Sequence, residues 1–400
     1  MNVVFVDPIA ATANVTARGV FRPEVPSLGR DPRNVRETKV VELATEMARR
    51  GHRPTVVLGD VFLGGREWTL DGGVRVVPVS TIMRVPFHPG LFPATPALLS
   101  HPALRDADVI QVSEFHQPST FFACVAAHER SIPVVVWQET FRHARFPGSV
   151  YQRAYESTAG RYVRSHARRF VLRTTNASAY LRRLQVAEGR IGPWIPTGID
   201  VTSFVPRAPR LSPVDFGWSA GDPILLLVGR LHPTKGVDLA LRTLKWVKRK
   251  YPAARLLVRG AGPEQAALAR LARDLGIEDS TRFVERKSRA EMVDLYNLAD
   301  VVVCTSRVDL MPFSLLEAAA CGRPAVATNV GAIPDIVEDG RTGLLVQPTV
   351  PAIGAAVCSL LGDEGLRATF GSEARRRAEQ RFALPVIVER FLEVYRDVAA

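Results

Sequence analysis

Residues 224–244 read ILLLVGRLHPTKGVDLALRTL, an apolar run, then a turn containing two glycines, then a helical pattern. The run over 223–228 predicts a buried strand, and the apolar spacing after Gly236 predicts a helix over 237–250. Short apolar runs alternate with helical patterns through the rest of this half, which predicts a parallel sheet covered on both faces. The other expected strands are 255–258, 282–284, 300–304, 324–327 and 343–346, and the expected helices are 264–275, 289–298, 314–321 and 332–338.

The first half of the chain shows the same alternation. Its expected strands are 3–6, 55–58, 74–79, 108–112, 133–137 and 170–173, and its expected helices are 36–50, 118–130 and 151–168. Prolines and glycines within 206–222 predict a linker. The expected fold class is therefore α/β, with two Rossmann-like doubly wound domains facing each other across a cleft that holds the ligand. We expect these domains over 1–205 and 223–384, with a last helix over about 385–400 crossing back to the first.

Composition narrows the class of protein. Of the 400 residues 46% are apolar and 23% are charged, as in soluble globular proteins. No stretch approaches the roughly 20 apolar residues of a membrane span, and the start, MNVVFVDPIA, reads as a first strand rather than a signal peptide. The cysteines are scattered, which favours buried thiols in a reducing compartment over a zinc site or disulfides. They are Cys124, Cys304, Cys321 and Cys358.

Arginines are concentrated between residues 142 and 183, where ten of them face one acidic residue and give a net charge of +9. Within the expected helix over 151–168, Arg161, Arg164 and Arg168 lie mostly off a stripe of tyrosines at helical spacing. One interpretation is a tyrosine stripe facing the core and a solvated basic face. The other is a patch for an anionic membrane or a phosphate-linked lipid acceptor. No nucleic-acid-binding motif accompanies the charge, so nucleic acid is not an expected partner.

Two short segments carry the residues expected to bind a ligand. Arg230 and Lys235 lie where a strand meets a helix, a position suited to a diphosphate. The stretch 309–317, DLMPFSLLE, follows another expected strand and puts Glu317 inside a helix. Two cations for phosphates and one carboxylate for a ribose together predict a nucleotide-sugar site.

On these residues the chain resembles the retaining glycosyltransferases of the GT-B fold, the large group that includes mannosyl-, glucosyl- and sucrose or glycogen synthase-like enzymes. The resemblance covers 223–347 and is weaker over 1–200. It implies transfer of a hexose from a UDP- or GDP-linked sugar to a hydroxyl acceptor with retention, in cell-envelope glycolipid or polysaccharide synthesis. The stretches that carry it are LLLVGRLHPTKGVDLALRTL (225–244), LLVRGAGPEQAALARLARDLG (256–276), the segment 295–346, and IPTGIDVTSF (195–204).

Carried over residue by residue, the resemblance makes Arg230 and Lys235 ligands of the donor diphosphate, whose charge grows as the sugar bond breaks. Glu317 is expected to accept hydrogen bonds from both ribose hydroxyls, although its carboxylate would also suit the helix dipole. Asp309 stands where the family has a glutamate, and its shorter carboxylate is expected to act on the donor sugar as a catalytic group. The other expected donor-binding residues are Gly229, Gly260, Gly262, Arg286, Lys287, Leu310, Met311, Pro312, Phe313 and Ser314.

The N-terminal half departs from the family pattern. The loop over 7–37 lacks two adjacent glycines that many relatives have. Glu139 stands where many relatives carry a histidine, and its carboxylate is expected to stabilise developing positive charge or to hold an acceptor hydroxyl. The alternative for Glu139 is a plain structural role. His116 and His143 are expected to be structural or surface residues.

The expected partners are a nucleotide-sugar donor, a lipid-linked or saccharide acceptor and an anionic membrane surface, in the cytoplasm or on the inner face of its membrane. No cofactor or metal is expected, because side chains neutralise the diphosphate in this fold. Two other classes stay open. One is a nucleotide-sugar-binding protein with weak turnover. The other, a dinucleotide-dependent oxidoreductase, is disfavoured because no Gly-x-Gly-x-x-Gly follows the first strand.

Overall fold

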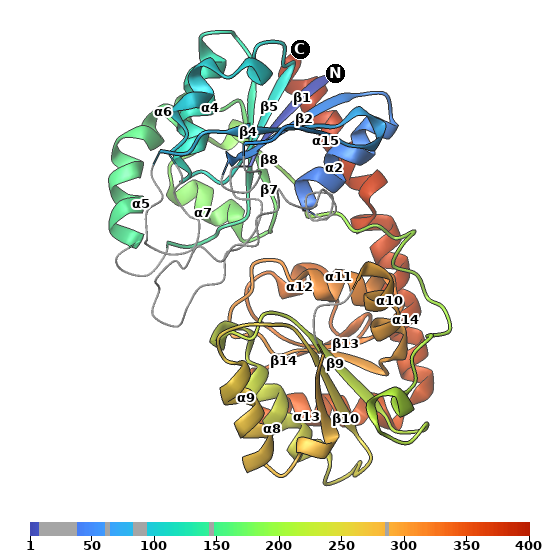
Figure 1. Cartoon of the computed structure of the whole chain (residues 1–400). Coiled ribbons are helices and arrows are strands. Elements are labelled where there is room, and N and C mark those ends of the chain that lie inside the picture. The colour runs from blue at the N-terminus through green and yellow to red at the C-terminus, as the bar shows by residue number, and fades with distance from the viewer. Residues whose placement is uncertain (8–37, 61–64, 83–93, 144–147, 285–287) are drawn as a thin grey trace. The chain divides into compact units, whose positions relative to one another are not determined.

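The computed structural model is an α/β protein that divides into two compact units (Figure 1). It describes residues 1–7, 38–60, 65–82, 94–143, 148–284 and 288–400. Unit 1 comprises Met1–Gly198 and Leu384–Ala400, and unit 2 comprises Ile199–Ala383. The stretch 206–222, which we expected to be a linker, lies inside unit 2. There the buried Trp218 donates its indole N–H to the carbonyl of Asp279 at 2.7 Å.

Unit 1 is built on an eight-stranded sheet in the order β3-β4-β2-β1-β5-β6-β7-β8. Neighbouring strands are parallel except β3 and β4. The central strands are apolar on both faces because helices cover both sides. The strands are β1 (Asn2–Val6), β2 (Arg53–Gly59), β3 (Trp68–Thr69), β4 (Arg75–Val79), β5 (Val109–Ser113), β6 (Val134–Gln138), β7 (Arg169–Leu172) and β8 (Ile191–Trp194).

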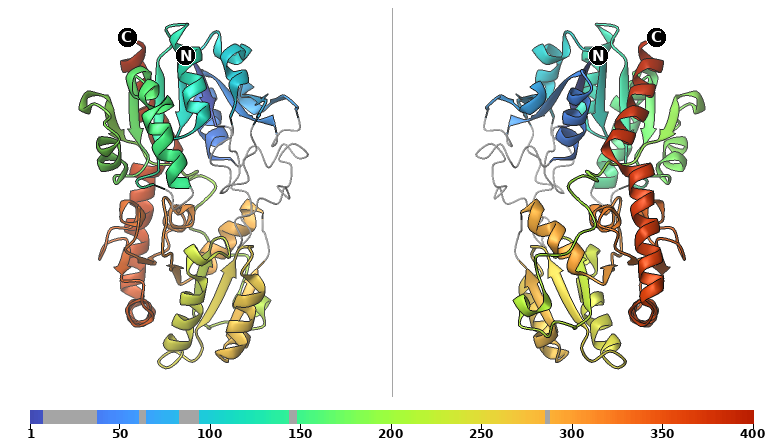
Figure 2. Two further views of the ribbon diagram at one scale, coloured as in Figure 1. Left: turned by 90° about the vertical axis from the view of Figure 1, so that its left-hand side faces the viewer. Right: turned by 90° about the vertical axis from the view of Figure 1, so that its right-hand side faces the viewer.

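Helices cover the two faces of this sheet. They are α2 (Lys39–Arg49), α4 (Pro118–His128), α5 (Gly148–Ser157), α6 (Ala159–His166), α7 (Ala177–Arg183) and α15 (Leu384–Ala399). Val4 and Val6 of β1 lie in a core with residues of α4, α6 and α7, whereas Val3 and Phe5 lie in a core with residues of α2 and α15. This alternation follows from the two-residue period of a strand. Figure 2 shows α15, at the red end of the chain, beside the blue N-terminal elements.

The prediction of one helix over 151–168 is wrong, because α5 and α6 occupy this segment as two helices. Between them Thr158 has φ −121° and ψ −103°, which is outside the helical region. Its hydroxyl donates to the carbonyl of Ala154 at 2.7 Å, a local bond of the kind that competes with regular helix. The next turn is packed closely, since a Cβ at Gly160 would lie 2.9 Å from the ring of Phe115. The bend at Thr158 therefore lets α6 reach the core.

Unit 2 is built on a six-stranded, fully parallel sheet in the order β11-β10-β9-β12-β13-β14. Each strand lies within one residue of the range expected from its apolar run. The strands are β9 (Ile224–Val228), β10 (Arg255–Arg259), β11 (Thr281–Val284), β12 (Val301–Cys304), β13 (Ala325–Thr328) and β14 (Gly343–Val346).

The helices of unit 2 alternate with these strands. They are α8 (Val237–Val247), α9 (Gln265–Asp274), α10 (Arg289–Leu298), α11 (Phe313–Ala320), α12 (Ile333–Ile336), α13 (Val350–Gly362) and α14 (Glu364–Arg377). Buried residues of α8, α9 and α13 form one core with β9, β10 and β12. No helix within the described ranges has the length and apolar character that crossing a membrane would need.

The strand order of each sheet reverses at one point, between β1 and β5 in unit 1 and between β9 and β12 in unit 2. Open parallel sheets bind ligands outside the carboxyl ends of their strands at such switch points. The segment that leaves β9 begins at Gly229, and the segment that leaves β12 begins at Thr305. The residues expected to bind the donor therefore follow the two strands that flank the switch point of unit 2.

Candidate functional site

The turn that leaves β9 touches the turn that leaves β10 at the level of the backbone. The amide of Gly229 donates to the carbonyl of Arg259, the last residue of β10, and the amide of Leu231 donates to that of Ala261, both at 3.0 Å. A Cβ at Gly260 would lie 1.8 Å from the carbonyl oxygen of Gly229, and one at Gly262 would lie 2.3 Å from that of Leu231. Only glycine fits at these two positions. The two glycines thus allow the close approach that holds the β9 turn.

The turn after β9 is also joined to the segment after β12. A short 3-10 turn, Pro233–Lys235, ends at Gly236, whose φ of +63° is the left-handed conformation that glycine favours. A Cβ there would lie 2.1 Å from the carbonyl oxygen of Thr305. The hydroxyl of Thr305 donates to the carbonyl of Gly236 at 2.7 Å. These contacts place Lys235 beside the segment that follows β12.

Lys235 and Asp309 form an ion pair in which Nζ lies 2.6 Å from Oδ2. The same Oδ2 accepts a hydrogen bond from the hydroxyl of Ser306 at 2.9 Å. The aspartate side chain is 6% exposed and the lysine side chain is 20% exposed, so the cation is the member that solvent can reach. A buried carboxylate needs such partners to remain ionised. Asp309 therefore balances the charge of Lys235 and fixes the position of its Nζ.

Arg230 differs from Lys235 because it has no partner among the residues that the structure describes. Its side chain is exposed, and among the described residues no hydrogen bond or ion pair involves its guanidinium. A guanidinium that is exposed on a glycine-held turn can grip two phosphate oxygens at once. The arrangement thus offers one uncommitted cation and one cation shared with a carboxylate to an anionic ligand.

The segment after Asp309 leads into α11 through Leu310, Met311 and Pro312. Met311 is buried, and Pro312 occupies the N-cap position without any side-chain cap. The N-terminus of α11 therefore presents its dipole and its first backbone amides, including those at Phe313 and Ser314, at the carboxyl end of β12. Oxygens of a sugar or a diphosphate are suited to such a terminus.

Glu317 lies one turn into α11 and is half-buried. Its Oε2 accepts a hydrogen bond from the hydroxyl of Tyr296 at 2.6 Å. Tyr296 belongs to α10 and is completely buried. This contact could not be predicted from the sequence, because a tyrosine within an apolar helical pattern indicates a core residue but not the partner of its hydroxyl.

Arg286 and Lys287, which were expected to meet the base, lie outside the described residues. The other donor-site candidates come from the ends of two neighbouring strands, β9 and β12, and from the turn after β10. The fold therefore brings together residues that are 80 or more positions apart in the sequence, as Arg230 and Glu317 are.

In unit 1, Glu139 follows β6 and forms an ion pair with Arg173 at 3.2 Å. The guanidinium of Arg173 lies over the ring of Trp137, 4.6 Å from its centroid, and donates to the hydroxyl of Thr197 at 2.7 Å. Both partners of the pair are about four-fifths buried, with 20% and 17% of their side chains exposed. Glu139 thus lies at the carboxyl end of β6, where the sequence places it, and is paired with Arg173.

A second carboxylate, Glu114, contacts the backbone of Glu139. It follows β5 and has a φ of +67°, which is uncommon outside glycine. It accepts hydrogen bonds from the amide of Glu139 at 2.8 Å and from the side-chain amide of Gln138 at 2.9 Å. Burial, reinforced by the charge of Glu139, raises the pKa of Glu114 to about 7. Glu114 was not among the predicted site residues, since a lone glutamate after a strand carries no distinctive pattern.

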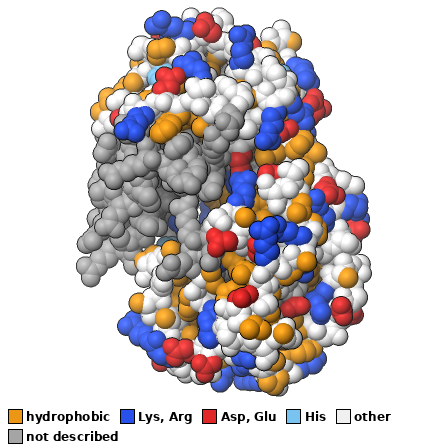
Figure 3. Space-filling model, turned by 45° about the vertical axis from the view of Figure 1, so that its right-hand side comes forward, with side chains coloured by type: hydrophobic (Ala, Val, Ile, Leu, Met, Phe, Trp, Pro, Cys, Tyr) orange, Lys and Arg blue, Asp and Glu red, His pale blue; other side chains and the backbone are white. Residues whose placement is uncertain are grey.

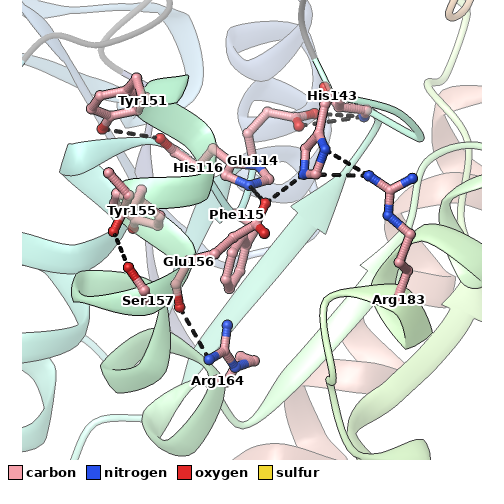
Figure 4. A network of polar contacts seen from close by, with 12 residues as sticks. Glu114, Phe115, His116, His143, Tyr151, Tyr155, Glu156, Ser157, Arg164 and Arg183 are labelled. Atoms are coloured by element: carbon pink, nitrogen blue, oxygen red, sulfur yellow. Dashed lines mark hydrogen bonds and ion pairs between the residues drawn. The ribbon is translucent and has the colours of Figure 1, made fainter. Parts of the chain in front are cut away.

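His116, His143 and Glu156 form a cluster at the same edge of unit 1 (Figure 4). One carboxylate oxygen of Glu156 lies 2.8 Å from Nε2 of His116 and 2.5 Å from Nε2 of His143. Burial lowers the pKa of His116 to about 4, so this ring is neutral and donates from Nε2. Although burial opposes it, the bonds from the two histidines lower the pKa of Glu156.

The three side chains are close enough to be considered as a metal site, but their hydrogen bonding favours a different role. Arg183 donates to Nδ1 of His143 at 2.6 Å, as the dashed lines of Figure 4 show. A neutral His143 that accepts at Nδ1 carries its proton on Nε2, and that proton is donated to Glu156. A metal would need the Nε2 lone pair and would lie beside the Arg183 cation. The cluster therefore joins β5, α5 and α7 as a structural network.

The three arginines of the expected basic patch have different surroundings. Arg161 and Arg168 are exposed, whereas Arg164 donates to the carbonyl of Glu156 at 3.1 Å and lies over the ring of Phe115. The tyrosines at helical spacing pack toward the core, as the first interpretation predicted. On the face drawn in Figure 3, basic and acidic side chains are interspersed.

Comparisons with known proteins match both units. Residues 212–377 match the family described as glycosyl transferases group 1, and residues 37–193 match the glycosyl transferase 4-like domain. A D-inositol 3-phosphate glycosyltransferase of Acidothermus cellulolyticus is 30% identical over 386 residues, which cover 90% of this chain and 85% of that protein.

Other relatives match over shorter stretches. A D-inositol 3-phosphate glycosyltransferase of Kineococcus radiotolerans is 36% identical over 50% of this chain and 51% of its own length. The GDP-mannose-dependent alpha-(1-6)-phosphatidylinositol monomannoside mannosyltransferase of Mycolicibacterium smegmatis is 34% identical over 46% of this chain and 50% of its own length. These two matches thus span about half of each relative.

Solved structures share the fold of the whole chain. The sucrose-phosphate synthase of Thermosynechococcus elongatus superimposes with a TM-score of 0.74 at 19% identity and covers 99% of this chain and 98% of its own. The Anabaena protein HepE, solved in complex with UDP, has a TM-score of 0.73 at 18% identity and covers 99% and 100%. At such identities the likeness concerns the fold alone.

Proposed function

Because the chain belongs to the group 1 glycosyltransferases of the GT-B fold, we propose that it transfers a hexose from a UDP- or GDP-linked sugar to a hydroxyl acceptor with retention of the anomeric configuration. The observation that carries this proposal is the set of Arg230, Lys235 and Glu317 around the switch point of unit 2. Two cations and a carboxylate at this place fit a diphosphate and a ribose.

In this mechanism the departing group is a nucleoside diphosphate, whose negative charge increases as the glycosidic bond breaks. Arg230 and Lys235 stabilise that charge from fixed positions, and the dipole of α11 adds to it. Lys235 enters the reaction already oriented by Asp309. These groups supply the positive charge that a metal ion supplies in other transferases.

Asp309 has a second role in the proposal, at the donor sugar. Its Oδ2 accepts from Lys235 and Ser306, and a carboxylate has about four acceptor sites in all. In this role a further acceptor site of the carboxylate would bind a hydroxyl of the donor sugar. In unit 1, Glu139 follows β6 at the edge where the acceptor is expected, and it would hold an acceptor hydroxyl or stabilise positive charge near the anomeric carbon.

The acceptor is proposed to be a polyol or saccharide, free or linked to a lipid, used in cell-envelope glycolipid or polysaccharide synthesis. Support comes from relatives whose names contain D-inositol 3-phosphate and phosphatidylinositol monomannoside. The GDP-mannose in the name of the mannosyltransferase and the UDP bound in the HepE structure support UDP- and GDP-sugars as the donors to be tried first.

We further propose that unit 1 docks on the inner face of an anionic membrane. Arg153, Arg161 and Arg168 are exposed, and no carboxylate of the described residues pairs with their guanidiniums. Val150, one turn before Arg153 on α5, is 57% exposed, which is unusual for a large apolar side chain. Basic side chains beside an exposed apolar one suit the surface of an anionic bilayer.

The test of the main proposal is a thermal-shift screen of UDP-, GDP- and ADP-sugars, with NAD as the comparison for a dinucleotide enzyme. The sugar that stabilises the protein is then used to measure release of nucleoside diphosphate, with and without a polyol acceptor. We expect stabilisation by one nucleotide sugar and its turnover. Stabilisation without turnover would leave a binding protein, and stabilisation by NAD alone would overturn the proposal.

A further inference from the structure

A completely buried hydroxyl contacts Glu317, the residue that is proposed to bind the ribose. The phenol of Tyr296 donates to Oε2 of Glu317 at 2.6 Å, and the tyrosine side chain has no exposed surface. A buried phenol requires a partner, and bonds to an ionised carboxylate are short and stronger than bonds between neutral groups. The hydrogen bond from Tyr296 to Glu317 is therefore a strong one.

The phenol can only donate in this contact. Burial, together with the charge of Glu317, raises the pKa of Tyr296 well above its ordinary value, so the hydroxyl keeps its proton at any physiological pH. The proton is thus permanently directed at Oε2. An ionised carboxylate offers about four acceptor sites, and the tyrosine occupies one of them.

The helix that carries the phenol is itself well anchored. Asn297, the next residue of α10, donates to the carbonyl of Val205 at 2.9 Å and accepts from the amide of Arg207 at 3.0 Å. Asp294 of the same helix forms an ion pair with Arg207 at 2.8 Å. At its start, Ser288 and Glu291 form a capping box. The position of the hydroxyl therefore follows from a rigid element.

Glu317, in contrast, has a long side chain at the partly exposed face of α11. A glutamate loses rotamer freedom when it binds a ligand, and a fixed bond to one oxygen removes that cost in advance. The same bond sets the plane of the carboxylate, and hence the directions in which it accepts. Two adjacent ribose hydroxyls are recognised only if those directions are correct.

We propose that Tyr296 is the positioning residue for ribose recognition, because it holds the carboxylate of Glu317 in the orientation that accepts the 2′- and 3′-hydroxyls of the donor nucleotide. The proposal rests on the proposed function, which assigns Glu317 to the ribose. Its consequence is that the site discriminates ribonucleotides from deoxyribonucleotides through a residue that does not touch the ligand.

The test is calorimetric titration with UDP, GDP and ADP, followed by the 2′-deoxy and 3′-deoxy forms of the nucleotide that binds. Tyr296→Phe should weaken the ribonucleotide about tenfold, the loss expected for one misdirected hydrogen bond to a charged group. It should weaken the deoxy forms much less, so the ratio of the two affinities should fall. A purely structural role would lower all affinities equally and leave that ratio unchanged.

The control is Tyr395→Phe, which removes a buried tyrosine hydroxyl bonded to Gln111 in unit 1 and should leave all nucleotide affinities as they are. A second comparison uses Glu317→Gln. The double variant with Tyr296→Phe should have nearly the same ratio of ribonucleotide to deoxyribonucleotide affinity as Glu317→Gln alone. An unchanged ratio in Tyr296→Phe overturns the inference alone. Failure of all three nucleotides to bind the parent protein overturns it together with the donor-site proposal.

Discussion

The two units share a parallel sheet with one switch point, but they build its carboxyl edge differently. In unit 2, backbone segments touch at Gly236, Gly260 and Gly262, where a Cβ would lie 1.8 to 2.3 Å from a carbonyl oxygen. In the described part of unit 1, the edge is made of side chains that bond to one another, as around Glu114 and Glu156. Glycine contacts admit one residue type, whereas side-chain contacts can be exchanged. This contrast explains why the family resemblance is specific over 223–347 and weak over 1–200.

The largest expected effect concerns the cations of unit 2. Arg230→Ala and Lys235→Ala should each lower turnover by at least about two orders of magnitude, because loss of one preorganised charge partner costs about 3 kcal/mol in the transition state. Initial rates of nucleoside diphosphate release measure this. Arg242→Ala, an exposed arginine on α8, is the matched control and should retain full turnover. Normal rates in both site variants would contradict the assignment of the donor site to this edge of the sheet.

The next effect belongs to unit 1 and concerns pH. The raised pKa of Glu114, about 7 when folded against about 4.5 when unfolded, means that the folded state holds its proton more tightly. This contribution to stability is complete below pH 4.5 and is lost as the pH rises to about 7. The shift corresponds to about 3 kcal/mol.

Denaturant unfolding at pH 5 and pH 8 tests this sign. The free energy of unfolding of the parent protein, relative to that of Glu114→Gln, should be higher at pH 5 than at pH 8. Glu67→Gln, which alters an exposed carboxylate of the same unit, should show no such change. If the parent protein instead gained stability relative to Glu114→Gln at pH 8, the hydrogen bonds to Glu114 would have more influence on its pKa than its burial has.

A smaller effect is expected at Asp309, and it separates two roles of that residue. Asp309→Asn should lower sugar transfer by about tenfold, the loss of a hydrogen bond to a charged group. It should not weaken the free nucleoside diphosphate, because it removes a negative charge 2.6 Å from Lys235. Titration calorimetry and initial rates give the two values. Weaker binding of the free diphosphate would show that Asp309 acts chiefly by holding Lys235.

The smallest effect per residue is expected at the arginines of unit 1. Reversal of Arg161 and Arg168 to glutamate should remove most of the sedimentation with phosphatidylserine vesicles, since each basic residue contributes about 1 kcal/mol near an anionic surface. Reversal of Arg164 as well should reduce sedimentation less than reversal of Arg161 or of Arg168 does, because Arg164 is bonded to the carbonyl of Glu156. Reversal of Arg242 and Arg270 in unit 2 is the control. A parent protein that ignores these vesicles at low salt would contradict docking.

Much of unit 2 was predictable, because its buried strands are continuous apolar runs and its site residues lie next to glycine turns. In unit 1 the sequence misled at Thr158, where a side-chain hydroxyl ends a pattern that is otherwise helical. The ion pairs of Asp309 and Glu139 were also beyond prediction, since each depends on a partner that the fold brings from another strand. Periodicity records which face a residue occupies, but it does not record which hydroxyl or guanidinium meets it there.

The placement of α15 has a consequence for how the chain is made. Its buried residues, among them Phe391 and Tyr395, complete the core that contains Val3 and Phe5 of β1. Unit 2 consists of the continuous stretch Ile199–Ala383 and can fold as soon as that stretch leaves the ribosome. Unit 1 begins first but must wait for the residues from Leu384 onward before its apolar surface is covered. The half that is translated first is therefore the half whose core is completed last.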